Sequence, residues 1–370
     1  MKHTFRIVAG MLLLAIPLCA NAQVKLKKPE NQTTEKTETT VKPEVKEPKG
    51  GFEMPKISGF VQGMYQANFN DEGKLMDNTL RMRRVRMSID GKLSKTVSYK
   101  IQGDFTRSPM LVDAFIKYKP CREFAIQLGQ FKTPFTIESP INPVNLEIFD
   151  YGEAVQQLGG YKDVCGVGAL GRDLGVMATG SLFPVEGEEG YKYSIVDYSI
   201  GVFNGNGANN LDNNNSKDLV GRLDVHPGLK EITLSGSYYY GKYTKDENID
   251  CTRNRWAAGA QYNDGKFLLR GEYIGGKTGI WDVANPYNSN GYYGVVGYNF
   301  QAGEQKIMPV LRYEHFTKDT GIVNGGTNWY TAGINYWPLK SVNCKLDYSL
   351  IQKEAGGNSH RVVAMVSYKF

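Results

Sequence analysis

The sequence predicts an all-β protein, a closed antiparallel barrel of 16 strands that crosses a membrane. Three observations support this prediction. From residue 56 onward, apolar and polar side chains alternate with a period of two in 16 segments. Short turns and longer loops alternate between these segments, as they do in bacterial membrane barrels. After the first 22 residues the chain has no run of 18 apolar residues, which excludes membrane-spanning helices.

The first 22 residues have the pattern of a secretory signal peptide. Lys2 and Arg6 make the start basic, residues 7–18 are apolar, and small residues lead to a cleavage site after Ala22. Cys19 leaves lipidation open as an alternative, although the residue before it is bulkier than a lipidation site prefers. We expect export with cleavage after Ala22.

Residues 23–55 predict a flexible periplasmic tail. Lys, Glu, Thr and Pro dominate this segment and aromatic residues are almost absent from it. Such a composition cannot bury enough apolar surface to offset the entropy lost on ordering. Association with peptidoglycan is the alternative interpretation. The predicted barrel follows over residues 56–370.

Each barrel segment has one apolar and one polar face. In residues 342–350, Val, Cys, Leu, Tyr and Leu alternate with Asn, Lys, Asp and Ser. A helix would scatter these residues around its axis. The 16 predicted strands cover residues 56–69, 79–92, 96–106, 110–119, 123–132, 172–182, 191–203, 218–226, 231–241, 255–262, 266–275, 291–300, 305–316, 327–337, 341–351 and 361–370.

A secreted soluble β-sandwich is the alternative for strands that alternate in this way. Charged pairs disfavour it, because they recur in the middle of strands on one face and suit a water-filled lumen. Aromatic residues also gather near both strand ends, where a bilayer has its interfaces. The pairs are Arg222 with Asp224, Arg270 with Glu272, Arg312 with Glu314 and Lys345 with Asp347; the aromatics are Tyr118, Phe124, Phe267, Tyr298 and Trp337 at turn ends and Phe105, Phe203, Tyr240, Tyr273 and Tyr313 at loop ends.

Charge and cysteine content exclude further classes. The formal net charge of +6 falls once the basic leader and tail are set aside, which argues against bulk nucleic-acid binding. The cysteines Cys121, Cys165, Cys251 and Cys344 fit no metal-ligand spacing. Isolated thiols are the simpler interpretation, and a Cys165–Cys251 bridge between outside loops is the alternative.

The sequence offers no catalytic constellation and predicts a protein that is not an enzyme. No histidine falls in a metal-ligand spacing, and no nucleophile elbow or phosphate-cradling motif occurs, so we expect no cofactor and no metal. An outer-membrane barrel hydrolase remains as an alternative, with His315 as the only candidate base.

Four arginines stand close together in the second predicted strand. If its apolar residues face lipid, Arg84 and Arg86 face the lumen, because a cation on the lipid face costs about 2–4 kcal/mol at the midplane. Arg81 and Arg83 then lie higher, near the outer mouth. Guanidinium groups present planar forks of donors to phosphate or carboxylate, so stacked arginines form a stepwise path for anions. The alternative is a solvated wall whose charge is balanced by acids.

Four motifs in order within about 100 residues resemble the phosphate-selective porin O and P family. This resemblance implies a 16-stranded, usually trimeric porin with an inward-folded constriction loop, here residues 133–171. The motifs are Arg83-Arg84, the segment Asp-Ala-Phe-Ile-Lys-Tyr-Lys-Pro at 113–120, Gly-Gln-Phe-Lys-Thr-Pro-Phe at 129–135, and Gly-Arg-Asp-Leu-Gly-Val at 171–176.

By resemblance, Arg83, Arg84 and Lys132 belong to a basic pathway, and Arg172 opens the strand after the loop. Together with the strand pattern, this gives the predicted pore-lining and anion-binding residues Arg81, Arg83, Arg84, Arg86, Lys100, Lys117, Lys132 and Arg172.

The expected activity is passive diffusion of small anions such as phosphate through a wide lumen. Acids also fall on the lumen face, namely Asp90, Asp104, Asp113 and Glu272. A general or sugar-type porin is therefore the competing interpretation. Expected partners are small anions, outer-membrane lipid, two further copies of the chain in a homotrimer, and the barrel assembly machinery, which would read the terminal aromatic strand ending at Phe370; nucleic acid is not expected.

Overall fold

The computed structural model describes residues 54–370 with the exception of residues 169, 245–249 and 281–282. The predicted signal peptide, residues 1–22, and the predicted tail as far as residue 53 lie outside the described residues. No helix in the described part of the chain is long and apolar enough to cross a membrane.

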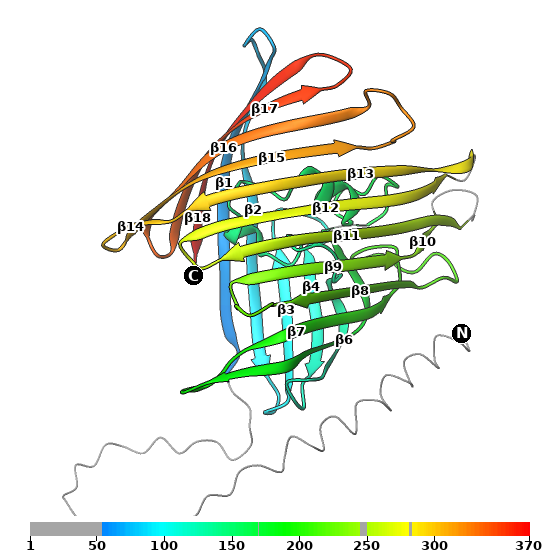
Figure 1. Cartoon of the computed structure of the whole chain (residues 1–370), viewed down its shortest axis with the longest axis vertical. Helices are drawn as coiled ribbons and strands as arrows, with labels where there is room; N and C mark the ends of the chain where they lie inside the picture. Colours follow the sequence, from blue (N-terminus) through cyan, green and yellow to red (C-terminus); the bar gives the residue numbers. More distant parts are fainter. Residues whose placement is uncertain (1–53, 169, 245–249, 281–282) are drawn as a thin grey trace, which may run out of the picture.

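The described strands form one antiparallel sheet that closes on itself where β1 pairs with β18 (Figure 1). Because β10 continues β9 and β14 continues β13, the 18 strand segments make a barrel of 16 strands, as predicted. The bounds are β1 Lys56–Asn70, β2 Leu75–Lys92, β3 Val97–Asp104, β4 Leu111–Tyr118, β5 Ala125–Lys132, β6 Arg172–Gly187, β7 Gly190–Phe203, β8 Asp218–Val225, β9 Ile232–Tyr240, β10 Lys242–Tyr243, β11 Cys251–Asn263, β12 Phe267–Ile280, β13 Val283–Tyr298, β14 Phe300–Ala302, β15 Gln305–Thr317, β16 Gly326–Leu339, β17 Val342–Lys353 and β18 Asn358–Lys369.

The two faces of the barrel wall are inverted relative to a water-soluble protein. On β15, Leu311 is 59% exposed while its neighbour Arg312 is 3% exposed. On β17, Leu346 is 55% exposed and Lys345 is 3% exposed. Apolar side chains thus cover the outside and charges line the inside, which suits a barrel in lipid and contradicts the sandwich alternative.

The strands extend beyond the predicted bounds at the loop end. Residues 276–280 and 283–290, predicted as loop, belong to β12 and β13, and Thr278 pairs with Tyr287 between these strands. The alternation that predicted strands fades here, because a hairpin that rises out of the lipid has water on both faces. Two predicted interfacial aromatics are also wrong: Phe203 is buried inside the barrel against Phe131, with ring centroids 5.6 Å apart, and Phe124 is buried as well.

The loop between β5 and β6, residues 133–171, folds into the lumen (Figure 1). It carries the 3-10 helix η2 (Pro143–Asn145) and the helix α2 (Glu153–Leu158), which packs against β12, β13 and β15. The approach of α2 requires glycine at position 291, because a Cβ there would lie 2.6 Å from the Cβ of Ala154. The hydrophobic core of the molecule therefore lies between this loop and one side of the barrel wall. Buried side chains of the loop in this core include Phe135, Leu146, Ile148, Val155 and Leu158.

Candidate functional site

One residue of β2 interrupts the alternation of the strand and adds a charge to the lumen. Gln62 of β1 pairs with Arg84, but its neighbour Gly63 pairs with Met82, so Arg83 is an extra residue in a β-bulge. A bulge places two consecutive residues opposite one on the partner strand and re-aims a side chain. Arg83 and Arg84 therefore both point into the barrel, although strict alternation would send one of them to lipid.

Asp150 of the inward loop joins the two arginines. Its Oδ1 accepts a hydrogen bond from Nη2 of Arg84 at 3.0 Å, and its Oδ2 accepts one from Nη2 of Arg83. Gln62 accepts a hydrogen bond from the other terminal nitrogen of Arg84 at 3.1 Å. Burial raises the pKa of Asp150, but the two arginines lower that pKa more, and the net result lies below its ordinary value. We call Arg83, Arg84 and Asp150 the guanidinium fork.

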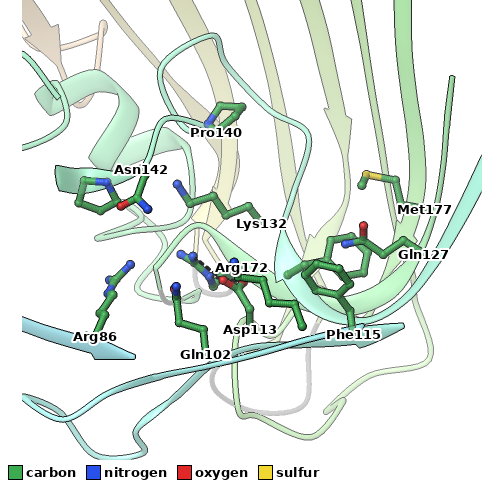
Figure 2. Close-up of a pocket in the computed structure, with 13 residues that line it drawn as sticks. Arg86, Gln102, Asp113, Phe115, Gln127, Lys132, Pro140, Asn142, Arg172 and Met177 are labelled. Atoms are coloured by element: carbon green, nitrogen blue, oxygen red, sulfur yellow. Dashed lines mark hydrogen bonds and ion pairs between the residues drawn. The ribbon is translucent and has the colours of Figure 1, made fainter. Parts of the chain in front are cut away.

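A cavity of about 250 Å³ lies on the turn side of the fork, between the loop and strands β2 to β6. Figure 2 shows side chains from both the strands and the loop around this space, which we call the inner cavity. Four cations line it against a single carboxylate. The cations are Arg86, Lys100, Lys132 and Arg172, the carboxylate is Asp113, and Gln102, Gln127 and Asn142 contribute amides.

Arg86 and Lys100 are paired with acids of the strands. Nε of Arg86 donates to Oδ2 of Asp104 at 2.9 Å, and Nζ of Lys100 donates to Oδ1 of Asp90 at 3.0 Å. The terminal nitrogens of Arg86 make no hydrogen bond to any residue that the structure describes. They are therefore available to an anion in the inner cavity.

Arg172 forms a two-point contact across the wall. Its Nε and Nη2 donate to the two carboxylate oxygens of Asp113 at 2.7 and 3.1 Å. The pair is nearly neutral as a unit, and it ties the start of β6 to β4 across the intervening strand β5. Arg172 contributes less to the field in the cavity than its charge alone suggests.

Lys132 is the cation of the inner cavity that lacks a carboxylate partner within the described residues. Its Nζ instead donates to the carbonyl oxygens of Ser139 and Ile141 and to the hydroxyl of Tyr151, the last two at 2.9 Å. Three neutral acceptors thus use the three donors of the ammonium group and leave its charge uncompensated. Lys132 supports the loop and makes the cavity positive.

A second polar cavity of about 180 Å³ lies on the loop side of the fork, and we call it the outer cavity. Arg81, Lys162 and Arg361 line it, and none of the three forms an ion pair with a residue that the structure describes. The guanidinium of Arg361 lies over the ring of Phe149, 4.6 Å from its centroid. Acids line the same cavity, among them Glu153.

On the opposite wall, loop acids bind the inward-facing arginines directly. Glu138 accepts hydrogen bonds from Arg312 and Arg270, and Arg270 also donates to Glu147. All of these charged groups except Glu147 are almost completely buried. Burial raises the pKa of Glu138, but Arg312 and Arg270 lower that pKa further, so the carboxylate stays ionised.

A second anchor on this wall uses one carboxylate for two arginines. Asp163 of the loop pairs with Arg253 at 3.4 Å and with Arg255 at 3.1 Å. Burial acts to raise the pKa of Asp163, and the two arginines reverse this effect and lower it. Both anchors tie the loop to β11, β12 and β15.

Seven of the eight predicted pore-lining residues lie at the fork or at one of the two cavities. Arg81 and Arg83 line the outer cavity, Arg84 belongs to the fork, and the other four line the inner cavity. Lys117 shares a face of β4 with Phe115 but lies nearer the turn and lines neither cavity. Sequence reasoning missed Asp150, Lys162 and Arg361.

The loop acids were missed because the loop has no periodicity that would orient its side chains. A count of the charged residues on the predicted lumen face and in the loop could have identified these acids. The predicted lumen face holds arginines on several strands, and the loop holds acids that need partners once they leave water. The loop acids with arginine partners are Glu138, Glu147, Asp150 and Asp163.

The structure also places His315, considered above as a catalytic base, and Cys165 and Cys251, considered above as a disulfide. His315 stacks on the outward-facing Tyr292, with centroids 5.1 Å apart, and its Nδ1 lies 2.9 Å from Oδ1 of Asn328. It lies at the loop-end aromatic belt, and its ring contacts there include Tyr292 and Asn328. Cys165 and Cys251 share a buried cluster, and both are thiols.

Comparison with known proteins supports the same architecture. Residues 56–254 match the family described as phosphate-selective porin O and P. No curated protein matches the sequence. An anion-selective porin from Comamonas acidovorans superposes with a TM-score of 0.63 at 14% identity, covering 85% of this chain and 99% of that one.

Two further solved barrels are similar in fold. The outer-membrane channel DcaP of Acinetobacter baumannii has a TM-score of 0.59 at 14% identity, covering 86% of this chain and 98% of that one. OmpT of Vibrio cholerae, folded in vitro and in a trimer form, has a TM-score of 0.57 at 12% identity, covering 86% of this chain and 100% of that one. At such identities the likeness concerns the fold.

Proposed function

Because the chain belongs to the phosphate-selective porin O and P family and is an outer-membrane porin, not an enzyme, we propose that it carries small anions, phosphate among them, by passive diffusion. The proposed route runs from the outer cavity past the guanidinium fork to the inner cavity. The anion-selective porin from Comamonas acidovorans, a structural neighbour, is consistent with this proposal.

One observation carries the proposal: the inner cavity has four cations and one carboxylate in its lining. Two of the cations, Arg86 and Lys132, act on a solute in different ways. The terminal nitrogens of Arg86 can donate hydrogen bonds to an anion, and the ammonium group of Lys132 has no carboxylate partner within the described residues. In a narrow passage with low-dielectric walls, such charges concentrate anions and repel cations.

A general porin is the second candidate, favoured by the extent of charge pairing. Acids compensate Arg86, Lys100 and Arg172 on the strands, and loop acids compensate the arginines of the opposite wall. If this compensation dominates, the passage discriminates by size more than by charge. Phosphate specificity would then be absent.

Planar-bilayer recording separates the two candidates. In a KCl gradient, the zero-current potential of an anion-selective channel lies close to the chloride equilibrium potential. Added phosphate should reduce the chloride current through such a channel. A potential near zero with no block by phosphate would leave the general porin as the function. Arg84→Glu reverses the charge of the fork arginine and should weaken or invert the anion preference; an unchanged preference would remove the arginine from the pathway.

We also propose that the chain forms a homotrimer and is inserted by the barrel assembly machinery. Support for the trimer comes from the trimer form of Vibrio cholerae OmpT. Support for the assembly step comes from the aromatic side chains of Tyr368 in β18 and of the adjacent Phe370, both of which are exposed on the barrel surface. Mass measurement of the detergent-solubilised protein tests the trimer, and truncation of Phe370 tests recognition by the assembly machinery.

A further inference from the structure

The guanidinium fork stands between the two cavities along β2. Arg83 and Asp150 line the outer cavity, and Arg86, further toward the turn, lines the inner cavity. A solute that moves along this wall must pass Arg84, whose two terminal nitrogens are occupied by Gln62 and Asp150. The structure thus shows an anion already bound in the passage, and that anion is a carboxylate of the channel itself.

The loop has other anchors on either side of Asp150. The backbone on either side has its own anchors: the N–H of Phe149 donates to Asp347 at 2.8 Å, and the N–H of Gly152 donates to Glu138 at 2.7 Å. The carbonyl of Leu146 accepts from Lys345. The side chain of Asp150 can therefore leave the fork while the loop stays on the wall.

The outer cavity contains cations that can attract incoming anions toward the guanidinium fork. Arg81, Lys162 and Arg361 present three charges that have no ion pair among the described residues. An incoming anion meets these cations first and then reaches two arginines that are bound to a tethered carboxylate. A tethered group competes with an effective concentration in the millimolar range. A solute with the same chemistry can replace it by exchange, without leaving a buried charge unpaired.

We propose that Asp150 is a built-in occupant of the anion site made by Arg83 and Arg84, and that carboxylate-bearing solutes pass by displacing it. This inference rests on the proposed anion conduction and names the solute class and the selectivity-determining residue of the same passage. Asp150 lowers the affinity of the fork for free anions and so keeps it from trapping them.

The test uses Asp150→Asn in the mature full-length chain, refolded and recorded in planar bilayers. We expect the chloride-to-potassium permeability ratio to rise at least about threefold, because one negative charge leaves the passage. The succinate concentration that halves the chloride current should fall at least about fivefold, because the tethered competitor is gone. Adding Arg83→Gln to Asp150→Asn should cancel both gains.

Glu147→Gln is the matched control. It removes the same charge from the same loop, but its partner Arg270 lies on the opposite wall, and neither residue lines a cavity. Equal shifts in both variants would overturn the inference, since they would report only the net charge of the loop. A rise in conductance without a change in permeability ratio would also overturn it, because the loop would simply have moved.

Failure of the proposed function is distinguishable from failure of this inference. A wild-type channel without anion preference contradicts the proposed function, whereas the change from wild type to Asp150→Asn decides the role of the fork. Stronger block by phosphate than by succinate at equal concentration, in both wild type and variant, would contradict the assignment to carboxylates.

Discussion

The two sides of the barrel wall carry arginines of the same orientation and use them differently. Arginines of β2, β6 and β18 border the two cavities, and part of their hydrogen-bonding capacity faces open space. On the side of β11 to β15, the inward loop covers the arginines, and its acids neutralise them in a buried layer. What the loop places over an inward arginine thus decides whether that arginine borders the proposed passage or forms part of the anchor.

The largest effect is expected where the anchor is broken. Glu138→Gln leaves the buried Arg270 and Arg312 with one carboxylate each, Glu147 and Glu314, and should cost about 3 kcal/mol of unfolding free energy. Asp90→Asn removes an acid of the open side, whose pair with Lys100 is partly exposed, and should cost no more than about 1 kcal/mol. Reversible urea unfolding in detergent or lipid measures both. Similar losses of unfolding free energy in the two variants would contradict the proposed difference between the two sides of the barrel wall.

A steric change on the anchor side should have the next largest effect. Gly291→Val places a Cβ where Ala154 of α2 packs at 2.6 Å, so the helix must shift at a cost of about 1–3 kcal/mol. Gly294→Val on the same strand faces outward, and a Cβ there meets nothing within 4 Å. The comparison uses the same unfolding measurement. An equal loss in Gly294→Val would show that the cost does not come from the contact with Ala154, since Val favours strands more than Gly does.

A change on the open side should alter selectivity, in addition to the stability lost with the buried pair of Arg86 and Asp104. Arg86→Gln removes the donors that face the inner cavity, and the chloride-to-potassium permeability ratio should fall about threefold. Arg255→Gln removes an anchor arginine and should leave that ratio nearly unchanged while lowering stability. Zero-current potentials in a KCl gradient check both variants. The contrast fails if Arg255→Gln shifts the potential as much as Arg86→Gln does.

The smallest effect is expected from moderate acidification. The pKa values of Glu138, Asp150 and Asp163 are all lowered in the folded chain. Groups with a lowered pKa contribute stability that is complete above the unfolded value of about 4 and is lost only as the pH falls through the folded value. The ion pairs of these three carboxylates should therefore persist between pH 7 and about pH 5, so the destabilisation caused by Glu138→Gln should be the same at both pH values. A smaller destabilisation at pH 5 would contradict this account.

The barrel and most of the wall residues could be predicted from the sequence, because lipid and water impose a two-residue period on every strand. Arg84 and Arg86 follow from this period alone. Arg83 does not, since only the register of β1 and β2 reveals the bulge. Asp150 lies in a segment without periodicity, and its partner depends on tertiary packing. Phe203 was misplaced because the loop turns part of the lumen into an apolar core.

The bulge in β2 has a consequence for how such a wall can vary over generations. Above and below Arg83 the alternation is in phase, with Arg81 inside, Met82 outside and Arg84 inside. Insertion or deletion of one codon at this point would therefore add or remove a single positive charge. Every other side chain of the strand would still face the lipid or the lumen as before. Barrel walls of this kind can acquire new ionic groups by insertion, without sacrificing any residue that already faces the membrane.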